Sequence, residues 1–287
     1  MKKTSTQTRS VRVKVIGMLG LLIAFLVVFF YGVGVGVYHW PPFSGLKAGK
    51  ALLDPNLDNR QQLYRSEGKP YTLTSSRLSY FALDAGGNLE LQQSLPYKSE
   101  GMYRFDRKIN PNSTVIVIMD PWVDMPSEHL NEYYGEIIES RIIPLVKRAL
   151  SRGHPIIVLT NKPSNVRYST QIHHELKALV ENFKASIIFH QDLDDDCFAT
   201  YLHSQGIESL IYIGFASNMC VIGRRMGMIP MTHQGFKIFF IPEASAALEY
   251  AHTWHDQSIH KATTKIISQS IAEIIDYDEF MRVPVSR

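Results

Sequence analysis

Residues 208–223, ESLIYIGFASNMCVIG, contain the pattern that decides the fold. Residues 211–213 are short, apolar and largely β-branched, which predicts a buried parallel strand. Gly214 permits a sharp turn, and Cys220 falls at the start of the next helical pattern. A thiol at a helix N-terminus feels the positive end of the helix dipole, which can lower its pKa, and the free N–H groups of such a turn can stabilise an oxyanion. We therefore interpret Cys220 as the leading candidate for a nucleophile; the alternative is a small buried hydrophobic residue.

Strand and helix patterns alternate from residue 113 onward. Such alternation is typical of an α/β protein with a mostly parallel, Rossmann-like sheet and helices on both faces. Ligands in such folds bind at the carboxyl ends of the central strands. The predicted strands are 115–119, 156–160, 186–189, 211–213, 236–241 and 273–275, and the predicted helices are 132–150, 170–183, 195–205, one ending near 235, and 256–270.

The overall composition argues against several classes of protein. The chain has 287 residues, a net charge of +3 and two cysteines. Its basic residues are scattered rather than clustered, so we expect no nucleic-acid partner. Cys197 and Cys220 form neither a disulfide framework nor a CxxC metal site; a single bridge between them remains an alternative.

The amino terminus predicts a membrane anchor. Residues 15–38 carry no charge and are long enough to cross a bilayer as a helix. The tail before them, residues 1–14, holds basic residues and no acidic ones, so we expect it on the cytoplasmic side and the remaining chain on the extracytoplasmic, periplasmic side. A cleaved signal peptide is the alternative, but no A-x-A-like cleavage site follows the apolar run.

Residues 39–112 are rich in Pro, Gly, Ser, Asn and charge. We interpret them as a linker or cap with one hairpin, residues 78–83 and 89–93, around the AGGN turn at 85–88. The domain boundaries are therefore predicted at 14, 38 and 112, and the α/β domain covers residues 113–287.

Asp120 closes the first predicted strand, in VIVIMDPWVDM, residues 115–125. It should face the same crevice as Cys220, where it can act as the base that takes the thiol proton and passes it to a leaving group. The alternative is an Asp that caps the following turn. Trp122 supplies an apolar wall for a small flat substrate.

From about residue 113 to 280 the chain resembles the isochorismatase-like cysteine hydrolases, a superfamily that includes nicotinamidases. The resemblance lies in IVIMD, in GFASNMCV and in FFIPEASAA. It implies a three-layer α/β/α sandwich that hydrolyses C–N or vinyl-ether bonds of small molecules. We expect no cofactor. The resemblance also implies Asp120 as the base, Cys220 as the nucleophile, a cis peptide at Phe215–Ala216, and an oxyanion hole at the N–H groups of Ala216 and Cys220. We expect Phe215, Ala216, Asn218 and Trp122 to contact the substrate.

The chain departs from the family at the lysine that usually completes its catalytic triad. That lysine follows the third strand, where this chain has HQDLDDDCF, residues 190–198. Lys162 is a possible replacement, but its neighbours are typical of an ordinary loop. The NMCVIGR turn, residues 218–224, is similar to that of relatives that also lack the lysine. Without a cation, a carboxylate beside Cys220 should disfavour ionisation of the thiol.

The acids of the 190–198 segment also suggest a metal site, with His190 and Asp192 among its candidate ligands. Adjacent acids rarely converge on one ion, and an acidic first turn of the next helix explains them more simply, so we expect no metal.

Two functional hypotheses follow. The first is a membrane-anchored cysteine hydrolase of a small amide or related C–N or ether substrate. The second is a catalytically silent subunit or scaffold, with a homo-oligomer or a membrane protein as its partner. An activated Cys220 needs a nearby cation that lowers its thiol pKa, whereas a crevice dominated by the acidic segment would raise it.

Overall fold

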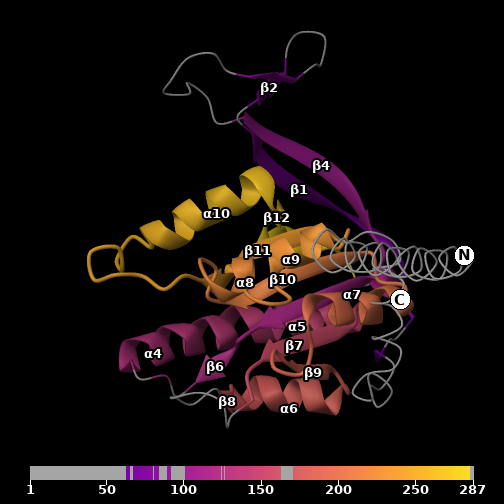
Figure 1. Ribbon diagram of the computed structural model, residues 1–287, viewed down its shortest axis with the longest axis vertical. Helices are drawn as coiled ribbons and strands as arrows, with labels where there is room; N and C mark the ends of the chain where they lie inside the picture. The colour runs from indigo at the N-terminus through magenta and orange to yellow at the C-terminus, as the bar shows by residue number, and fades with distance from the viewer. Residues whose placement is uncertain are drawn as a thin grey trace, which may run out of the picture. The chain divides into compact units, whose positions relative to one another are not determined.

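The core of the protein is a sheet of six parallel strands, which appears in the computed structural model in the positions that the sequence predicts (Figure 1). The structure describes residues 63–64, 67–79, 81–83, 89–91, 101–123, 125, 127–162 and 171–284, all within the second of two compact units, Asp58–Arg287. Each strand pairs in parallel with the next. In spatial order they are β12 (Glu273–Ile275), β11 (Lys237–Ala246), β10 (Ser209–Phe215), β5 (Thr114–Met119), β7 (Ile156–Thr160) and β9 (Ser186–Phe189).

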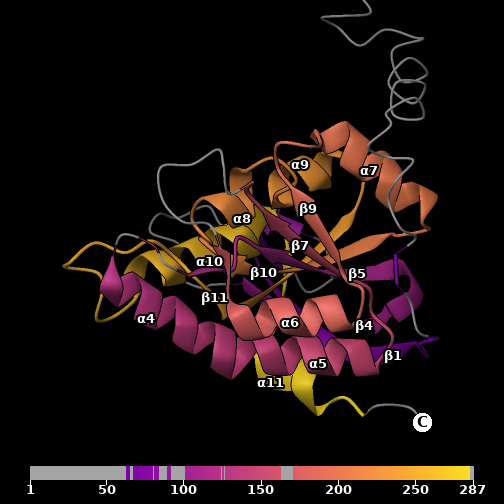
Figure 2. The same cartoon turned by 90° about the horizontal axis from the view of Figure 1, so that it is seen from below.

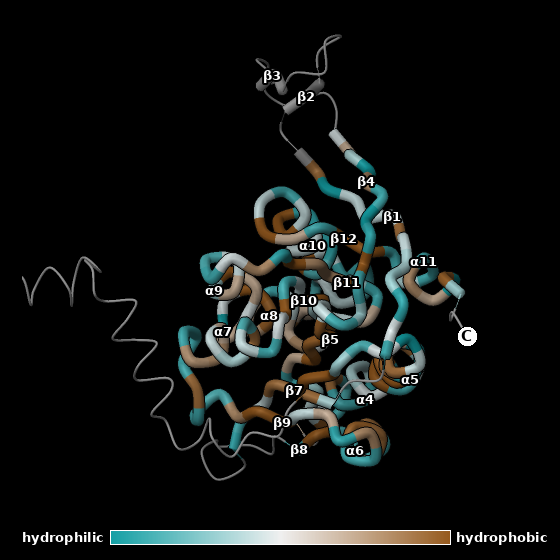
Figure 3. Tube along the Cα trace, turned by 90° about the vertical axis from the view of Figure 1, so that its right-hand side faces the viewer, coloured by the Kyte–Doolittle hydropathy of each residue, from teal (hydrophilic) through white to brown (hydrophobic). Residues whose placement is uncertain are grey.

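Helices cover both faces of this sheet, as expected for a three-layer α/β/α sandwich (Figure 2 and Figure 3). Because β5 is covered from both sides, all six of its residues are buried. One layer holds α4 (Glu128–Ile137), η2 (Ile138–Ile142), α5 (Ile143–Ser151), α6 (His174–Asn182) and α11 (Tyr277–Arg282). The other layer holds α7 (Asp195–Ser204), α8 (Cys220–Gly223), α9 (Met228–His233) and α10 (Ser258–Ser270).

The helix predicted at 132–150 is one helical stretch, but a π-helical turn divides it. The segment η2 lies between α4 and α5, and the N–H of Ile143 donates to the C=O of Ile138, five residues back. Pro144, in the first turn of α5, explains the break. Proline has no N–H, and its ring clashes with the carbonyl four residues earlier, so the regular i→i−4 ladder cannot continue there.

Two further strands extend the sheet, and they revise our interpretation of residues 39–112. β1 (Tyr71–Ser79) pairs antiparallel with β12, and β4 (Gly101–Ile109) pairs antiparallel with β1 along nine residue pairs. The sheet therefore has eight strands rather than six. The predicted hairpin exists as β2 (Phe81–Leu83) and β3 (Leu89–Leu91), which pair only with each other. Its first strand is shorter than predicted, because residues 78 and 79 belong to β1.

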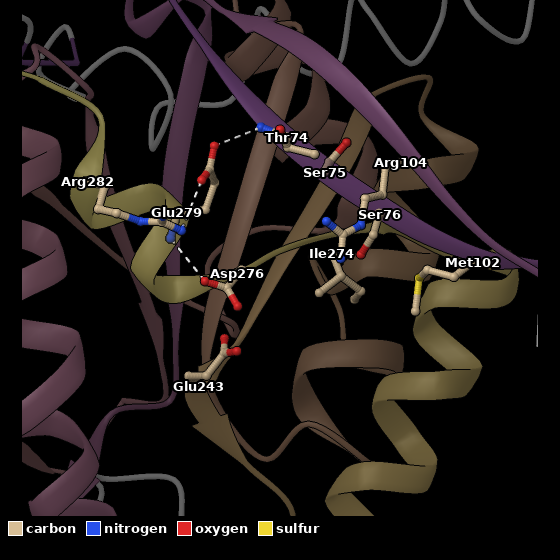
Figure 4. Close-up of a pocket in the computed structure, with 10 residues that line it drawn as sticks. All are labelled: Thr74, Ser75, Ser76, Met102, Arg104, Glu243, Ile274, Asp276, Glu279 and Arg282. Carbon is tan, nitrogen blue, oxygen red and sulfur yellow. Dashed lines mark hydrogen bonds and ion pairs between the residues drawn. The ribbon is translucent and has the colours of Figure 1, made fainter.

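The junction of β1 with α11 is held by polar contacts around a cavity of about 510 Å³ (Figure 4). Asp276 caps α11 by accepting a hydrogen bond from the N–H of Glu279, at 3.0 Å. The carboxylate of Glu279 in turn accepts one from the N–H of Thr74 in β1, at 3.2 Å, and pairs with Arg282 at 3.3 Å. The short helix α11, which the sequence did not predict, thus fastens β1 to the core.

Glu273, on β12, joins three strands through its carboxylate. Arg107 of β4 donates two hydrogen bonds to it, at 2.9 and 2.8 Å, and the hydroxyl of Ser75 in β1 donates a third, at 2.5 Å. Burial would raise the pKa of Glu273, but the hydrogen bonds from Arg107 and Ser75 outweigh it and hold that pKa below its usual value.

The predicted span 15–38 and the basic tail 1–14 lie outside the described residues. Within the described ranges, no helix combines the length and the apolar composition needed to cross a membrane.

We expect Arg107→Met to lower the free energy of unfolding by about 2 kcal/mol, because it removes two charge-assisted hydrogen bonds from a largely buried carboxylate. Urea denaturation measures this, and Lys108→Met, at an exposed position of the same strand, is the matched control. The pKa of Glu273 is lowered in the folded protein. The difference in free energy of unfolding between the unmodified protein and Arg107→Met should therefore have its full size above about pH 4.3, and it should shrink as the pH falls through the folded-state pKa of Glu273. An equal loss in both variants would contradict this role of the ion pair.

Candidate active site

Asp120 and Cys220 are brought together because they follow neighbouring strands of the parallel sheet. Asp120 comes directly after β5, and its N–H donates to the C=O of Leu159 at 2.8 Å. Its side chain is only 2 % exposed, and its φ of 44° is in the left-handed region. Such backbone conformations in residues other than glycine cluster at functional sites. Cys220 begins α8, five residues after β10 ends at Phe215.

The turn between β10 and α8 has the geometry that the sequence resemblance implies. The Phe215–Ala216 peptide bond is cis. One residue earlier, Gly214 has a φ of 102°, and a Cβ atom there would lie 2.2 Å from the backbone oxygen of Met119. Only glycine therefore allows β10 to approach the end of β5 this closely. Cys220 is the first residue of α8, so its N–H has no acceptor within the helix.

Both side chains line one cavity of about 390 Å³. Most of its wall is apolar and aromatic, and the polar groups gather near Cys220. The lining residues are Trp122, Met125, Tyr134, Phe215, Ala216, Met219 and Leu248 on the apolar side, with Asp120, Asn161, Gln191, Cys220 and Arg224 on the polar side.

The lysine of the family's catalytic triad has no counterpart in residues 190–198, and Arg224 supplies a cation at the site instead. Its Nη1 donates to Oδ2 of Asp120 at 2.8 Å and lies 3.7 Å from Sγ of Cys220. Its Nη2 donates to Oδ1 of Asn161. Arg224 follows α8 directly, four residues after Cys220, so one helical turn places the guanidinium beside the thiol. One cation therefore contacts both the base candidate and the nucleophile candidate.

His190 holds the other oxygen of the Asp120 carboxylate. Its Nε2 lies 3.2 Å from Oδ1 of Asp120, and its side chain is 4 % exposed. A carboxylate only accepts hydrogen bonds, so Nε2 is the donor. Arg224 and His190 together fix the orientation of the carboxylate.

Lys162 does not replace the family lysine. Its side chain pairs with Asp192 and is 40 % exposed, and it is not part of the cavity wall. The backbone of Lys162 nevertheless supports the site, because its N–H donates to Oε1 of Gln191 at 3.0 Å. Gln191 in turn donates to Oδ1 of Asn161 at 2.9 Å, which positions the acceptor that Arg224 uses.

The acids of the 190–198 segment have local hydrogen-bonding roles. Asp194 caps α7 by accepting from the N–H of Cys197 at 2.8 Å. Asp195 accepts from the N–H of Met226 at 2.6 Å, and Asp196 accepts from Gln234 at 2.8 Å. They belong to the first turn of a helix, as the simpler sequence interpretation expected.

The predicted substrate contacts divide into two groups. Phe215, Ala216 and Trp122 line the cavity. Asn218 does not: its side chain bonds to the backbone of Leu248 instead, accepting from its N–H at 3.0 Å. Asn218 thus supports Leu248, which is part of the cavity wall, and its contact with a substrate stays a prediction. No disulfide joins Cys197 and Cys220, so the alternative of a bridge between them is not realised.

Of the two outcomes left open by the sequence, the pKa of the Cys220 thiol is raised rather than lowered. Burial, and next the charge of Asp120 and its hydrogen bond to the thiol, raise the pKa of Cys220 to about 11, and Arg224 offsets only part of this. The helix α8 has only four residues, so its dipole is too small to counter these effects. The carboxylate that raises the pKa is Asp120, not the acidic segment 190–198.

Several solved structures are similar to this chain at low sequence identity. No family model matches the chain, and no curated protein matches it in sequence. An isochorismatase from Pseudomonas putida KT2440 is 18 % identical, with a TM-score of 0.46, over 58 % of this chain and 90 % of its own. The nicotinamidase SaPncA from Staphylococcus aureus is 18 % identical, with a TM-score of 0.43, over 56 % and 96 %. The ycaC gene product of Escherichia coli, an octameric hydrolase of unknown specificity, is 16 % identical, with a TM-score of 0.43, over 60 % and 79 %.

Sequence reasoning missed Arg224, His190, Asn161 and Tyr134 as parts of this site. A pattern that points to Arg224 was present, since it stands four residues after Cys220 in the NMCVIGR turn. For the other three residues, only the folded arrangement reveals their neighbours.

We expect alkylation of Cys220 by iodoacetamide to be slow at pH 8, because a thiol with a pKa of about 11 is ionised there to roughly one part in a thousand. Asp120→Asn should accelerate alkylation at this pH, and Arg224→Gln should slow it, because the two charges act on the thiol in opposite directions. The rates are measured in a Cys197→Ser background between pH 7 and 11.

Arg225→Gln is the matched control for Arg224→Gln. Arg225 is the next residue, and its guanidinium contacts the backbone oxygen of His190 at 3.4 Å. Fast alkylation of the unmodified site at pH 7, or equal slowing by both arginine variants, would contradict the assigned electrostatics.

Proposed function

We propose that this protein is a cysteine hydrolase of a small amide or a related C–N or ether substrate. The observation that carries the proposal is the guanidinium of Arg224, which contacts both Asp120 and the sulfur of Cys220, and all three residues line one cavity. A nucleophile beside a base, with a third group that orients the base, is the arrangement that covalent catalysis requires.

In the proposed reaction, the thiol is neutral at rest and loses its proton only as it attacks. Asp120 accepts this proton while Sγ of Cys220 bonds to the substrate carbonyl carbon, and the oxyanion faces the N–H groups of Ala216 and Cys220. Asp120 then returns the proton to the leaving nitrogen as the C–N bond breaks. Water attacks the thioester with Asp120 again as the base, and the acid product leaves as the Cys220 thiol re-forms.

Arg224 has a purely electrostatic role in this scheme. A guanidinium stays protonated in proteins, so it cannot carry the proton that Asp120 transfers. It stabilises the carboxylate before the attack, and it stabilises negative charge on sulfur once Asp120 is protonated. The negative charge next to Arg224 therefore lies on the Asp120 carboxylate before the attack and on the sulfur of Cys220 after the proton has moved, while the guanidinium stays in place.

A catalytically silent subunit is the second candidate, and the raised pKa of Cys220 is the observation that favours it. A buried cysteine with no reaction to perform would have the same property.

We expect the full-length protein to release ammonia from at least one member of a panel of small neutral primary amides. Cys220→Ala should abolish this activity, and Asp120→Asn should reduce kcat by about 10²–10⁴-fold, because it removes the proton carrier. Arg224→Lys should retain more activity than Arg224→Gln, since it keeps the charge, and Arg225→Gln should leave activity unchanged. Equal activity of the Cys220→Ala variant would contradict the proposal, and a panel without any turnover would favour the silent subunit.

We also propose that residues 15–38 anchor the protein in a membrane, with the α/β domain on the extracytoplasmic side. The support is the uncharged length of this segment and the basic tail before it. Protease added outside sealed cells whose outer barrier has been opened should then digest the α/β domain while the cytoplasmic membrane stays intact. Reversing the charges of Lys2, Lys3 and Arg9 should reduce this accessibility, whereas digestion only after lysis would contradict the orientation.

A further inference from the structure

Ser217 lies within the turn that carries the proposed oxyanion hole, between Ala216 and Cys220, and it is fully buried. Its N–H donates to the C=O of Ala246 at 2.8 Å, and its hydroxyl lies 2.9 Å from Nδ1 of His260. Both polar groups of Ser217 therefore bond to partners outside the turn. Through them the turn, residues 215–220, is joined to the end of β11 and to α10.

His260 is held in a fixed orientation in the first turn of α10. Its Nε2 lies 3.1 Å from the C=O of Pro242 in β11, and its backbone N–H donates to Oε1 of Glu249 at 2.8 Å. A carbonyl oxygen only accepts hydrogen bonds, so Nε2 carries a hydrogen. The neutral imidazole then has a bare Nδ1, and this nitrogen accepts the hydrogen bond from the hydroxyl of Ser217.

Two other histidines precede α10, and they show the contrast. His252 and His255 are both exposed, and the ring of His252 stacks on that of Tyr250, with 5.9 Å between ring centroids. Among the described residues, Ser217 contacts neither of these imidazoles. The link from this part of the chain to the 215–220 turn is therefore specific to His260.

Protonation of His260 changes this link. The added proton binds Nδ1, which then donates instead of accepting, and the hydroxyl hydrogen of Ser217 loses its acceptor in a fully buried place. Burial lowers the pKa of His260, and the C=O of Pro242 and the charge of Glu249 oppose this only in part. His260 is therefore neutral at pH 7 and becomes charged only below about pH 6.5. The other titratable or charged groups that line the groove beside it are Tyr133, Glu136, Arg141, Glu243, Lys261 and Lys265.

We propose that His260 is a positioning residue of the Cys220 site. Its neutral imidazole holds Ser217, and through Ser217 it keeps the N–H groups of Ala216 and Cys220 in the orientation that binds the oxygen of a tetrahedral adduct. A small movement of the turn matters, because such donors stabilise an oxyanion only within about 2.7–3.1 Å of its oxygen. This inference rests on the proposed function only in placing the oxyanion hole at these two N–H groups.

Benzaldehyde tests this without requiring turnover. The thiol of Cys220 adds across the aldehyde C=O: an S–C bond forms, the thiol proton passes to the oxygen, and a reversible hemithioacetal places that oxygen beside the two N–H groups. The step takes up and releases no net proton, so the pH acts only through the groups of the site. NMR of a carbon-13 label in the C=O follows the change to a tetrahedral carbon and gives the dissociation constant in the Cys197→Ser protein.

We expect this dissociation constant to be steady above about pH 6.5 and to rise about tenfold as the pH falls through the pKa of His260, which is the usual scale of one hydrogen bond. His260→Asn supplies an amide oxygen that accepts from Ser217 and cannot be protonated, so binding should stay tight between pH 5 and 8. His260→Leu and Ser217→Ala should bind about tenfold more weakly at every pH. His255→Asn, the matched control, should keep the unmodified profile.

A loss of binding in acid that persists in His260→Asn would overturn the proposal, because another group would then be responsible. The same holds for tight binding by His260→Leu, or for the absence of an adduct at pH 8. Urea denaturation identifies a purely structural role: it would make His260→Leu and Ser217→Ala less stable while His260→Asn kept the pH dependence. Failure of the hydrolase proposal is distinguishable, because it appears as absent amide turnover while the pH-dependent adduct persists.

Discussion

The ion pair between Asp120 and Arg224 is the interaction on which the site depends. Asp120 is almost completely buried, and a carboxylate in such a place is stable only when it is paired. Losing one partner of a buried pair typically costs about 3–5 kcal/mol. The end of β5, the turn after β10 and the short helix α8 must therefore keep a fixed relation, since together they bring the two charges within 2.8 Å. The same ion pair therefore stabilises the fold around the site and takes part in the proposed chemistry.

The cation of this site comes from a different element of the fold than the lysine of the family that the sequence resembles. In the family that the sequence resembles, a lysine after the third strand completes the triad, and here that position is occupied by the 190–198 segment. Arg224 instead comes from the element that carries Cys220, so nucleophile and cation are displaced together by any movement of that turn. His190, which comes from the third-strand edge, contacts Asp120 as a hydrogen-bond donor instead. The same edge of the sheet thus still contributes to the site through a different kind of group.

The six parallel strands could be predicted because their apolar runs are short, separated by helical patterns and fully buried. The closeness of Asp120 and Cys220 could then be predicted too, because they come after neighbouring parallel strands, whose carboxyl ends lie at the same edge of the sheet. β4 was missed although it alternates, with Arg104, Asp106 and Lys108 exposed, because the surrounding Pro, Gly and Ser residues suggested a linker. The role of Arg224 depends on the path of a four-residue helix, and the contact of Ser217 with His260 joins residues that are far apart in the sequence. Neither is a property of local sequence.

The place of β1 in the sheet has a mechanical consequence. With an anchor at residues 15–38, any tension between membrane and domain enters through the chain that leads into β1. That strand lies between β12 and β4, and it pairs with β4 along nine residue pairs. Hydrogen bonds in such a ladder run perpendicular to the strands, so a lengthwise pull loads them in shear and all at once rather than one after another. β1, the first strand that the structure describes, is therefore well suited to bear load along its length, and the Cys220 turn, at the end of β10, lies two strands further into the sheet from β12.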